Sequence, residues 1–249
     1  MENLSQTQNL LLLIGAAILP AILLVWYIYW RDKYQREPVS QILRGVAFGV
    51  ISALIAIGLE NAILWIIGAF PEGWTGAVLK GFVGAAIPEE AAKLLMLYLL
   101  LRRNPYFDER FDGIVYAVCI GMGFAGTENI IYLVRSFNFW QSVAVGRAIF
   151  AVPCHFFLAV TMGYFYSMIF FERDKVKWPL MVYLVPVLFH GIYDSLIFMA
   201  NLNTLWSGAM LLLFYYFCFL LFRYGKQRIG EQLERDRHDP TQRAFYMKV

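Results

Sequence analysis

The chain has 249 residues, of which 60% are hydrophobic and only 16% are charged, and its formal net charge is +3. Soluble domains carry about 25% charged residues, so this composition excludes a soluble globular protein. The sequence has no basic stripe interleaved with aromatics, as a nucleic-acid-binding protein would have. Its three cysteines all lie in apolar runs, which excludes an extracellular disulfide framework.

Seven apolar stretches follow one another, and each is long enough to cross the membrane. A hydrocarbon core about 30 Å thick needs about 20 mostly apolar residues per helix, and no stretch alternates as transmembrane strands do. The first stretch lacks the basic start of a signal peptide, so we expect it to be retained. We therefore expect an all-α polytopic membrane protein with about seven spans. They are 9–30, 41–70, 77–101, 113–134, 147–171, 178–200 and 205–223.

Basic residues set the expected orientation. Seventeen of the 21 Lys and Arg residues follow spans one, three, five or seven, and only Lys80, Arg135 and Arg147 lie on the other side. Cytoplasmic loops carry the excess of basic residues. We therefore expect an extracytoplasmic N-terminus and a cytoplasmic C-terminus. We expect one transmembrane domain over 1–224 and a solvated cytoplasmic tail over 225–249.

Ionisable residues inside the spans are the main functional signal. Each costs about 2.5–3.5 kcal/mol near the bilayer centre on insertion scales, so we expect them to face one another or a hydrated cavity. Glu60 and Asn61 in span two fall at similar depth and are candidate lining residues of that cavity. The deep ionisable residues of spans three to six are Glu89, Glu90, Lys93, Glu128, His155, His190 and Asp194.

Span three brings two adjacent carboxylates and a lysine together. Glu89 and Glu90 point about 100° apart on a helix, so we expect them to have different roles. Glu89 and Lys93 have the favourable i, i+4 order, so one carboxylate can be neutralised while the other faces a cavity as a general base. Pro88 removes a backbone donor and should loosen the helix here. The structural alternative is an ion pair that only locks helices together.

Span four holds a glycine-rich stretch that permits close helix packing, followed by Glu128 and Asn129. Phe124 lies on the same helix face as Glu128. Asp112, at the cytoplasmic edge, is expected to be an interface anchor or a helix N-cap.

Spans five and six add His155, His190 and Asp194. His190 and Asp194 lie one turn apart, so the carboxylate can orient the imidazole or share a ligand role. A lone membrane histidine often makes only an interhelical hydrogen bond, but two histidines beside three glutamates indicate a site. At 1.5 Å per residue, these groups fall at similar depth, near the midplane or in the outer half. Water should reach them from the extracytoplasmic side.

These motifs together resemble the PrsW proteases, a family related to the CAAX prenyl proteases. The matching motifs are Glu-Glu-x-x-Lys at 89–93, Phe-x-x-x-Glu-Asn at 124–129, a histidine at 155 and His-x-x-x-Asp at 190–194. Trp30-Arg31-Asp32 resembles a family stretch after the first span. Lys93 and Glu128 depart from the CAAX pattern, which favours PrsW over enzymes of prenylated substrates.

The resemblance implies an intramembrane endopeptidase of a bacterial cell membrane. Its substrate would be a membrane-anchored anti-sigma factor, cut first on the extracytoplasmic side in envelope-stress signalling. The catalytic core would be spans three to six, about 77–200. The catalytic residues would be Glu89, Glu90, Glu128, His155, His190 and Asp194, supported by Lys93, Phe124 and Asn129.

In this mechanism Glu89 or Glu90 would activate water. His190, His155 or a neighbouring donor would stabilise the oxyanion and protonate the leaving amine. A bound zinc ion would be held by Glu128, His155 and His190, all competent ligands. No His-Glu-x-x-His helix occurs in the sequence, and we favour glutamate catalysis without a metal or other cofactor.

The main alternative is a proton- or ion-coupled transporter, which also needs buried carboxylates and histidines. The acids cluster rather than form a relay across the bilayer, and the spans show no inverted repeat. A retinal-type receptor is disfavoured because Lys93, the intramembrane lysine, falls in span three.

Overall fold

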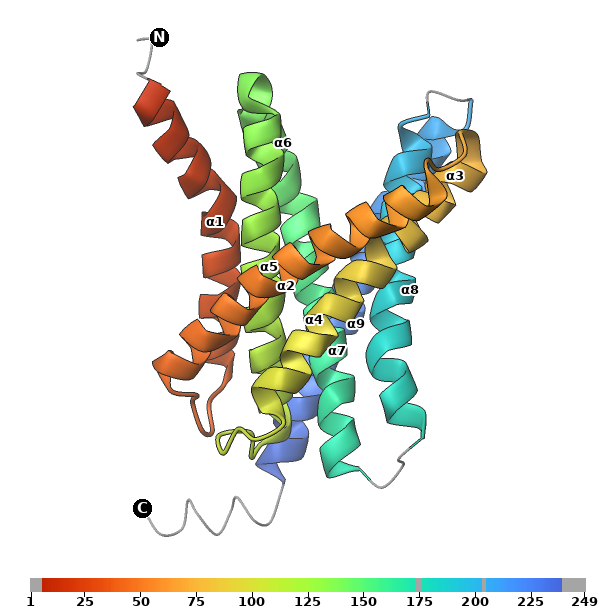
Figure 1. Ribbon diagram of the computed structural model, residues 1–249. Coiled ribbons are helices and arrows are strands. Elements are labelled where there is room, and N and C mark those ends of the chain that lie inside the picture. The colour runs from red at the N-terminus through yellow and green to blue at the C-terminus, as the bar shows by residue number, and fades with distance from the viewer. Residues whose placement is uncertain (1–5, 173–175, 203–204, 239–249) are drawn as a thin grey trace.

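The computed structural model describes residues 6–172, 176–202 and 205–238. Within these residues every regular element is a helix (Figure 1), which confirms an all-α polytopic membrane protein. In the described part of the chain, six helical stretches are long and apolar enough to cross a membrane. Their main helices are α1 (Gln6–Arg31), α2 (Val39–Ile67), α5 (Arg110–Arg135), α7 (Val152–Phe171), α8 (Lys177–Ala200) and α9 (Ser207–Arg237).

The stretch predicted as span three is not one regular helix. It consists of α3 (Gly73–Leu79), the π-helical η1 (Lys80–Ala86) and α4 (Ile87–Leu101). A second π-helical stretch, η3 (Arg147–Ala151), directly precedes α7. The 3₁₀ turn η2 (Phe137–Phe139) and the short helix α6 (Trp140–Gly146) come before η3.

Both π-helical stretches end just before a proline. Pro88 and Pro153 stand in the first turn of α4 and α7. Proline lacks a backbone N–H and clashes with the carbonyl four residues earlier, so the regular hydrogen-bond ladder cannot run through it. π-Helical turns concentrate at functional sites. Here each one directly precedes residues predicted to be catalytic, Glu89 and Glu90 in α4 and His155 in α7.

Helix α5 is the centre of the bundle. In its most apolar window 78% of the residues are buried inside the protein, against 22% for α1 and 17% for α9. It packs against α7, α2 and α1. The outer helices expose large apolar side chains such as Trp65 and Leu212, as lipid-facing surfaces do.

Glycines let α5 approach two neighbours closely. A Cβ atom at Gly123 would overlap the backbone of α2 at Val46 and Gly49, and one at Gly163 of α7 would overlap α5 at Gly113. This is the small-residue packing of membrane helices. It confirms the packing role predicted for the glycine-rich stretch.

The last helix extends well beyond the predicted end of span seven. In Figure 1, α1 begins at one end of the bundle and α9 ends at the other. Helix α9 continues to Arg237, and Ile229, Gln232 and Asp236 are buried. Residues 225–237 are therefore helical, with one face packed against the bundle and the other exposed, where the sequence predicted a solvated segment. The rest of the predicted tail, 239–249, lies outside the described residues.

The end of α9 caps the start of α5. The Asp236 carboxylate accepts hydrogen bonds from the backbone N–H groups of Arg110 (3.1 Å) and Phe111 (2.8 Å). Asp112 accepts those of Asp108 (3.0 Å) and Glu109 (2.6 Å). The first N–H groups of a helix lack intrahelical partners, so these carboxylates satisfy them. Asp112 is thus the N3 residue of a capping box whose N-cap is Glu109, so it supports the cap but is not the predicted N-cap itself.

Five buried carboxylates gather at this end of α5, and we call them the distal cluster. Its members are Asp32, Glu37, Glu109, Asp112 and Asp236, each at most 3% exposed. The Tyr116 hydroxyl donates a hydrogen bond to Glu37. Burial raises the pKa of Asp32 and of Glu37 to about 7, and burial together with neighbouring carboxylates raises the pKa of Glu109 to about 8.

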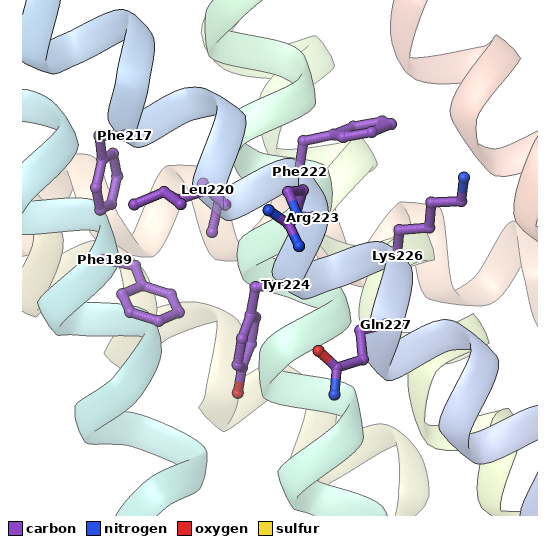
Figure 2. A pocket seen from close by; sticks show the side chains of 9 residues that line it. Phe189, Phe217, Leu220, Phe222, Arg223, Tyr224, Lys226 and Gln227 are labelled. Carbon is purple, nitrogen blue, oxygen red and sulfur yellow. The ribbon is translucent and has the colours of Figure 1, made fainter.

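A cavity of about 770 Å³ lies between α8 and α9 (Figure 2). Aromatic side chains, among them Phe189, Phe217 and Tyr224, line it, together with Arg223 and Lys226. Its lining, among the described residues, includes no carboxylate or imidazole. It therefore lacks the groups needed for hydrolytic chemistry.

Candidate active site

The deep ionisable residues of spans three to six do gather in one place. Glu89, Glu90 and Lys93 come from α4, Glu128 from α5, His155 from α7, and His190 and Asp194 from α8. We call these seven residues the Glu/His cluster. The expectation from insertion cost, that they face one another or a cavity, is confirmed by their contacts.

Lys93 lies at the middle of the cluster. Its ammonium nitrogen is 2.8 Å from Glu90 Oε1 and 3.2 Å from Glu89 Oε2, and it lies 3.9 Å from the centre of the Phe124 ring. The sequence paired Lys93 with Glu89 at i, i+4, but Glu90 at i, i+3 is the closer partner. Both carboxylates of α4 therefore share a single cation.

The two carboxylates differ in what surrounds them, as their angular separation predicted. Glu90 is fully buried, and its Oε1 contacts both Lys93 and His190 Nδ1 (2.8 Å). Glu89 is 5% exposed and lines a large cavity. Only Glu89 of the pair can therefore meet a water molecule that enters from this cavity.

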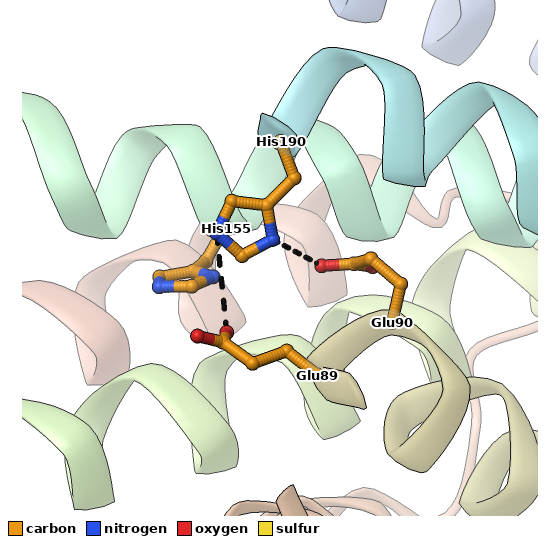
Figure 3. A group of neighbouring side chains, drawn as sticks. All are labelled: Glu89, Glu90, His155 and His190. Carbon is orange, nitrogen blue, oxygen red and sulfur yellow. Dashed lines mark hydrogen bonds and ion pairs between the residues drawn. The ribbon is translucent and has the colours of Figure 1, made fainter. Parts of the chain in front are cut away.

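His190 is directed at both carboxylates. Figure 3 shows Glu89 and Glu90 reaching from α4 toward its ring, with His155 alongside. His190 Nδ1 is hydrogen-bonded to Glu90. His190 Nε2 lies 3.9 Å from Glu89 Oε2 and 3.5 Å from Asp194 Oδ2. Asp194, predicted to orient this imidazole, is therefore a more distant partner than Glu90.

His155 is held from both sides. Its Nδ1 lies 3.2 Å from the Lys93 ammonium, and its Nε2 lies 2.9 Å from Glu128 Oε2. An ammonium group can only donate a hydrogen bond, so Nδ1 is the acceptor. The ring proton then belongs on Nε2, where it is donated to Glu128; this tautomer is assigned from the contacts.

Glu128 has a second basic partner. Arg147 Nη2 lies 2.6 Å from Glu128 Oε2, and Arg147 Nε lies 2.5 Å from Asn129 Oδ1. Asn129 in turn donates to the Ala17 carbonyl of α1 (2.9 Å). Asn129, predicted as a supporting residue, thus joins α1 to the arginine of η3.

A cavity of about 1240 Å³ opens onto the cluster. Glu89, Phe124 and Glu128 line it, and so do Glu60 and Asn61 of α2, as the sequence predicted. Residues 68–73, between α2 and α3, form another part of its wall. In Figure 1 this connection lies at the end of the bundle where α1 begins. The cavity can bring water and a peptide to Glu89 and Glu128.

Four side chains of the cluster offer donor atoms suited to a metal ion. They are Glu89, Glu90, His155 and His190, whose ligand atoms lie within 4.8 Å of one another. This set differs from the predicted zinc ligands, because Glu128 instead pairs with Arg147 and His155. The residue types suit zinc. However, the Lys93 ammonium lies within 3.2 Å of three of the four groups. The Lys93 ammonium would therefore compete with a metal ion for the same donors.

The sequence did not predict the role of Arg147. From the sequence, Arg147 counted only as one of the few basic residues on the expected extracytoplasmic side. One signal was present: Arg147 and His155 stand eight residues apart, a spacing that returns a helix to the same face.

Comparisons with known proteins agree with this geometry. Residues 37–222 match the model of the PrsW family of intramembrane metalloproteases. The chain is 35% identical over 202 residues to "Protease PrsW" of Clostridioides difficile, covering 80% of this chain and 83% of that protein. It is 33% identical to that of Bacillus subtilis (74% and 82%) and 30% identical to that of Halalkalibacterium halodurans (90% and 99%). No solved structure matches the chain. The chain is an intramembrane protease of the PrsW family, a multi-pass protein of a bacterial membrane.

Proposed function

We propose that Glu89 is the general base of this intramembrane endopeptidase. The observation that carries the proposal is the difference between two adjacent acids. Glu89 lines the large cavity, whereas Glu90 is fully buried between Lys93 and His190. A base must lie within hydrogen-bond reach of the water that it deprotonates, and only Glu89 of this pair borders the space that water can enter.

The reaction follows from the neighbours of Glu89. Glu89 takes a proton from water, and the hydroxide formed attacks the peptide carbonyl. His190 acts here as an imidazolium, with Nδ1–H donated to Glu90 and Nε2–H facing Glu89. This Nε2–H and the Lys93 ammonium are the donors nearest to the developing oxyanion. Protonation of the leaving amine completes the cleavage, with the proton that Glu89 accepted or one from His190. Glu90 holds His190 Nδ1–H and so keeps Nε2 directed at Glu89.

We propose that catalysis needs no metal. The support is the Lys93 ammonium, which lies within 3.2 Å of Glu89, Glu90 and His155 and supplies the positive charge among these donors. Turnover of the purified protein in detergent should therefore survive dialysis against a strong chelator. Loss of turnover on chelation, restored by added zinc, would contradict this part of the proposal.

The proposed substrate is a single-pass membrane protein, an anti-sigma factor, cut near its extracytoplasmic juxtamembrane segment. Two features support this. The family resemblance implies such a substrate, and the cavity wall formed by residues 68–73 lies at the end of the bundle where α1 begins. The excess of basic residues on the opposite side favours an extracytoplasmic position for that end.

Substitution of the two glutamates tests the proposal. Glu89→Gln keeps the shape of the side chain but removes the base, so turnover should fall about 10²–10⁴-fold while a single-pass substrate still binds. Glu90→Gln should weaken the hold on Lys93 and His190 and lower the thermal midpoint as well as turnover. Glu234→Gln, at an exposed acid of α9, is the control.

The measurement is cleavage of a single-pass substrate at matched amounts of folded protein. Turnover of Glu89→Gln within twofold of the unchanged protein would contradict the assignment of Glu89 as the base. Full turnover by both variants would end the glutamate mechanism.

A further inference from the structure

Arg147 makes more contacts than any role as an interface anchor requires. Its guanidinium binds Glu128 Oε2 through Nη2 (2.6 Å) and Asn129 Oδ1 through Nε (2.5 Å), and it lies 4.1 Å from the centre of the Tyr132 ring. Its side chain is only 14% exposed. A guanidinium that binds two groups at once fixes their positions more firmly than a lysine can.

The group that Arg147 fixes is the one that orients His155. Glu128 Oε2 accepts hydrogen bonds from both Arg147 Nη2 and His155 Nε2. With the Lys93 ammonium on Nδ1, the imidazole is fixed in one tautomer and one ring orientation. Its ring centre lies 5.3 Å from that of His190, so a rotated His155 would disturb both His190 and Lys93.

We propose that Arg147 is a positioning residue for proteolysis, which acts through Glu128 to hold the orientation and the tautomer of His155. Arg147 itself does not line the cavity at Glu89, so it acts at one remove from the reaction. The inference rests on the proposed glutamate mechanism and adds to it Arg147, a basic residue of η3.

The location of Arg147 makes this positioning mechanically firm. It is the first residue of η3, which continues into the helix that carries His155. Through Asn129 it is also linked to the backbone of α1 at Ala17. One side chain therefore connects α1, α5 and the start of α7. Glu128 is therefore linked by hydrogen bonds to all three helices.

Two substitutions test the proposal. Arg147→Gln removes the charge and both contacts to Glu128 and Asn129, and should lower kcat about 10–100-fold, as loss of a group that orients a functional histidine does. KM should change little, because Arg147 does not line the cavity. Arg147→Lys keeps the charge but can satisfy only one of the two contacts, so its kcat should be intermediate. Arg44→Gln is the matched control, since the Arg44 guanidinium also lies over an aromatic ring, that of Phe48 (5.6 Å), but on another helix.

A spectroscopic readout separates positioning from stability. The chain has three histidines, so selective ¹⁵N-histidine labelling of the full protein in detergent gives few signals, each assigned by a single-histidine substitution. His155 should show a proton on Nε2 in the unchanged protein and in Arg44→Gln. In Arg147→Gln this signal should shift toward a mixture of tautomers, and Arg147→Lys should shift it less.

Reduced kcat together with the shifted His155 signal would support the proposal. An unchanged kcat would overturn it, and so would a reduced kcat with an unshifted signal, which would mean that Arg147 only stabilises the fold. If Arg147→Gln does not fold, the Arg147→Lys protein decides by the same two readouts. Failure of the glutamate mechanism itself would appear separately, as full turnover by Glu89→Gln and Glu90→Gln.

Discussion

Two groups of buried carboxylates lie toward opposite ends of α5, and they are neutralised in different ways. Asp112 of the distal cluster and Glu128 of the Glu/His cluster are 16 residues apart, which is about 24 Å along a helix. In the Glu/His cluster Lys93 forms ion pairs with Glu89 and Glu90, and Arg147 forms one with Glu128. In the distal cluster the partners are backbone N–H groups and the Tyr116 hydroxyl.

The difference separates the proposed active site from a cluster that caps a helix. Among the described residues, Asp32, Glu37, Glu109 and Asp112 form no ion pair with a Lys or Arg side chain. Burial without a basic partner raises the pKa values of Asp32, Glu37 and Glu109, so protons take the place of cations there. In the Glu/His cluster the neutralising cations are Lys93 and Arg147, and in the proposed mechanism the protons remain available for transfer to and from a substrate.

Loss of the shared cation should give the largest effect. Lys93→Met leaves Glu89 and Glu90 buried without a basic partner on α4. Breaking a buried ion pair in this way costs about 3–5 kcal/mol, which corresponds to a fall of about 10 °C in the thermal midpoint. Lys226→Met, at an exposed lysine of α9, should leave the midpoint unchanged. Equal midpoints for the two variants would show that Lys93 is not needed to neutralise the cluster.

Removal of the helix cap should have a moderate effect. Asp236→Ala frees the N–H groups of Arg110 and Phe111 at the start of α5, and loss of a helix cap costs about 0.5–2 kcal/mol. Glu234→Ala, two residues earlier on the exposed face of α9, is the control. Thermal unfolding of both proteins in the same detergent measures the difference. A midpoint for Asp236→Ala equal to that of the control would show that the end of α9 does not support α5.

The smallest effect should have the opposite sign. In the distal cluster Asp32→Asn and Glu109→Gln remove carboxylates that the fold prefers to keep protonated. Each should raise the free energy of unfolding at pH 8 by about 1 kcal/mol. This increase is measured as a higher thermal midpoint. A lower midpoint in both variants would mean that these carboxylates have a stabilising partner that the amides cannot replace.

The same cluster predicts how stability depends on pH. The folded-state pKa values of Asp32, Glu37 and Glu109 lie above their ordinary values near 4, so the folded protein binds more protons than the unfolded chain between about pH 4 and pH 8. Stability should therefore fall as pH rises through this window. The fall should be shallower in Asp32→Asn than in the Glu234→Gln control. A midpoint that rises from pH 5 to pH 8 would contradict the raised values.

Much of the Glu/His cluster could be predicted because lipid makes isolated charges costly. That cost alone required Glu128, His155 and His190, on three different spans, to share one interior space. It could not show which of Glu89 and Glu90 borders the cavity. Which glutamate borders the cavity depends on how far α4 is rotated about its axis by η1. A π-helical turn leaves no regular signal in the pattern of apolar residues, so this rotation could not be predicted.

The distal cluster was harder to predict because its residues stand in or beside connections. Asp32 and Glu109 resemble ordinary loop acids in the sequence, and nothing in the local pattern indicates that both are buried. Hydropathy placed the end of span seven at 223, since the residues after it are polar on average. Ile229 and Leu233 pack with the apolar core, but two apolar residues in a polar stretch, together with the cap formed by Asp236, were too sparse a signal to indicate that the helix continues.

The π-helical stretches η1 and η3 have a consequence for how such a site arises and can be retuned. A π-bulge holds about one residue more than the α-helix that it interrupts, so it acts as an insertion absorbed without a loop. Deleting one residue from η1 would turn α4 by about 100° relative to α3, the angle that separates Glu89 from Glu90. A change of one codon could thus exchange the acid at the cavity for its sealed neighbour. In the proposed mechanism, the number of residues in η1 therefore decides which glutamate is the base.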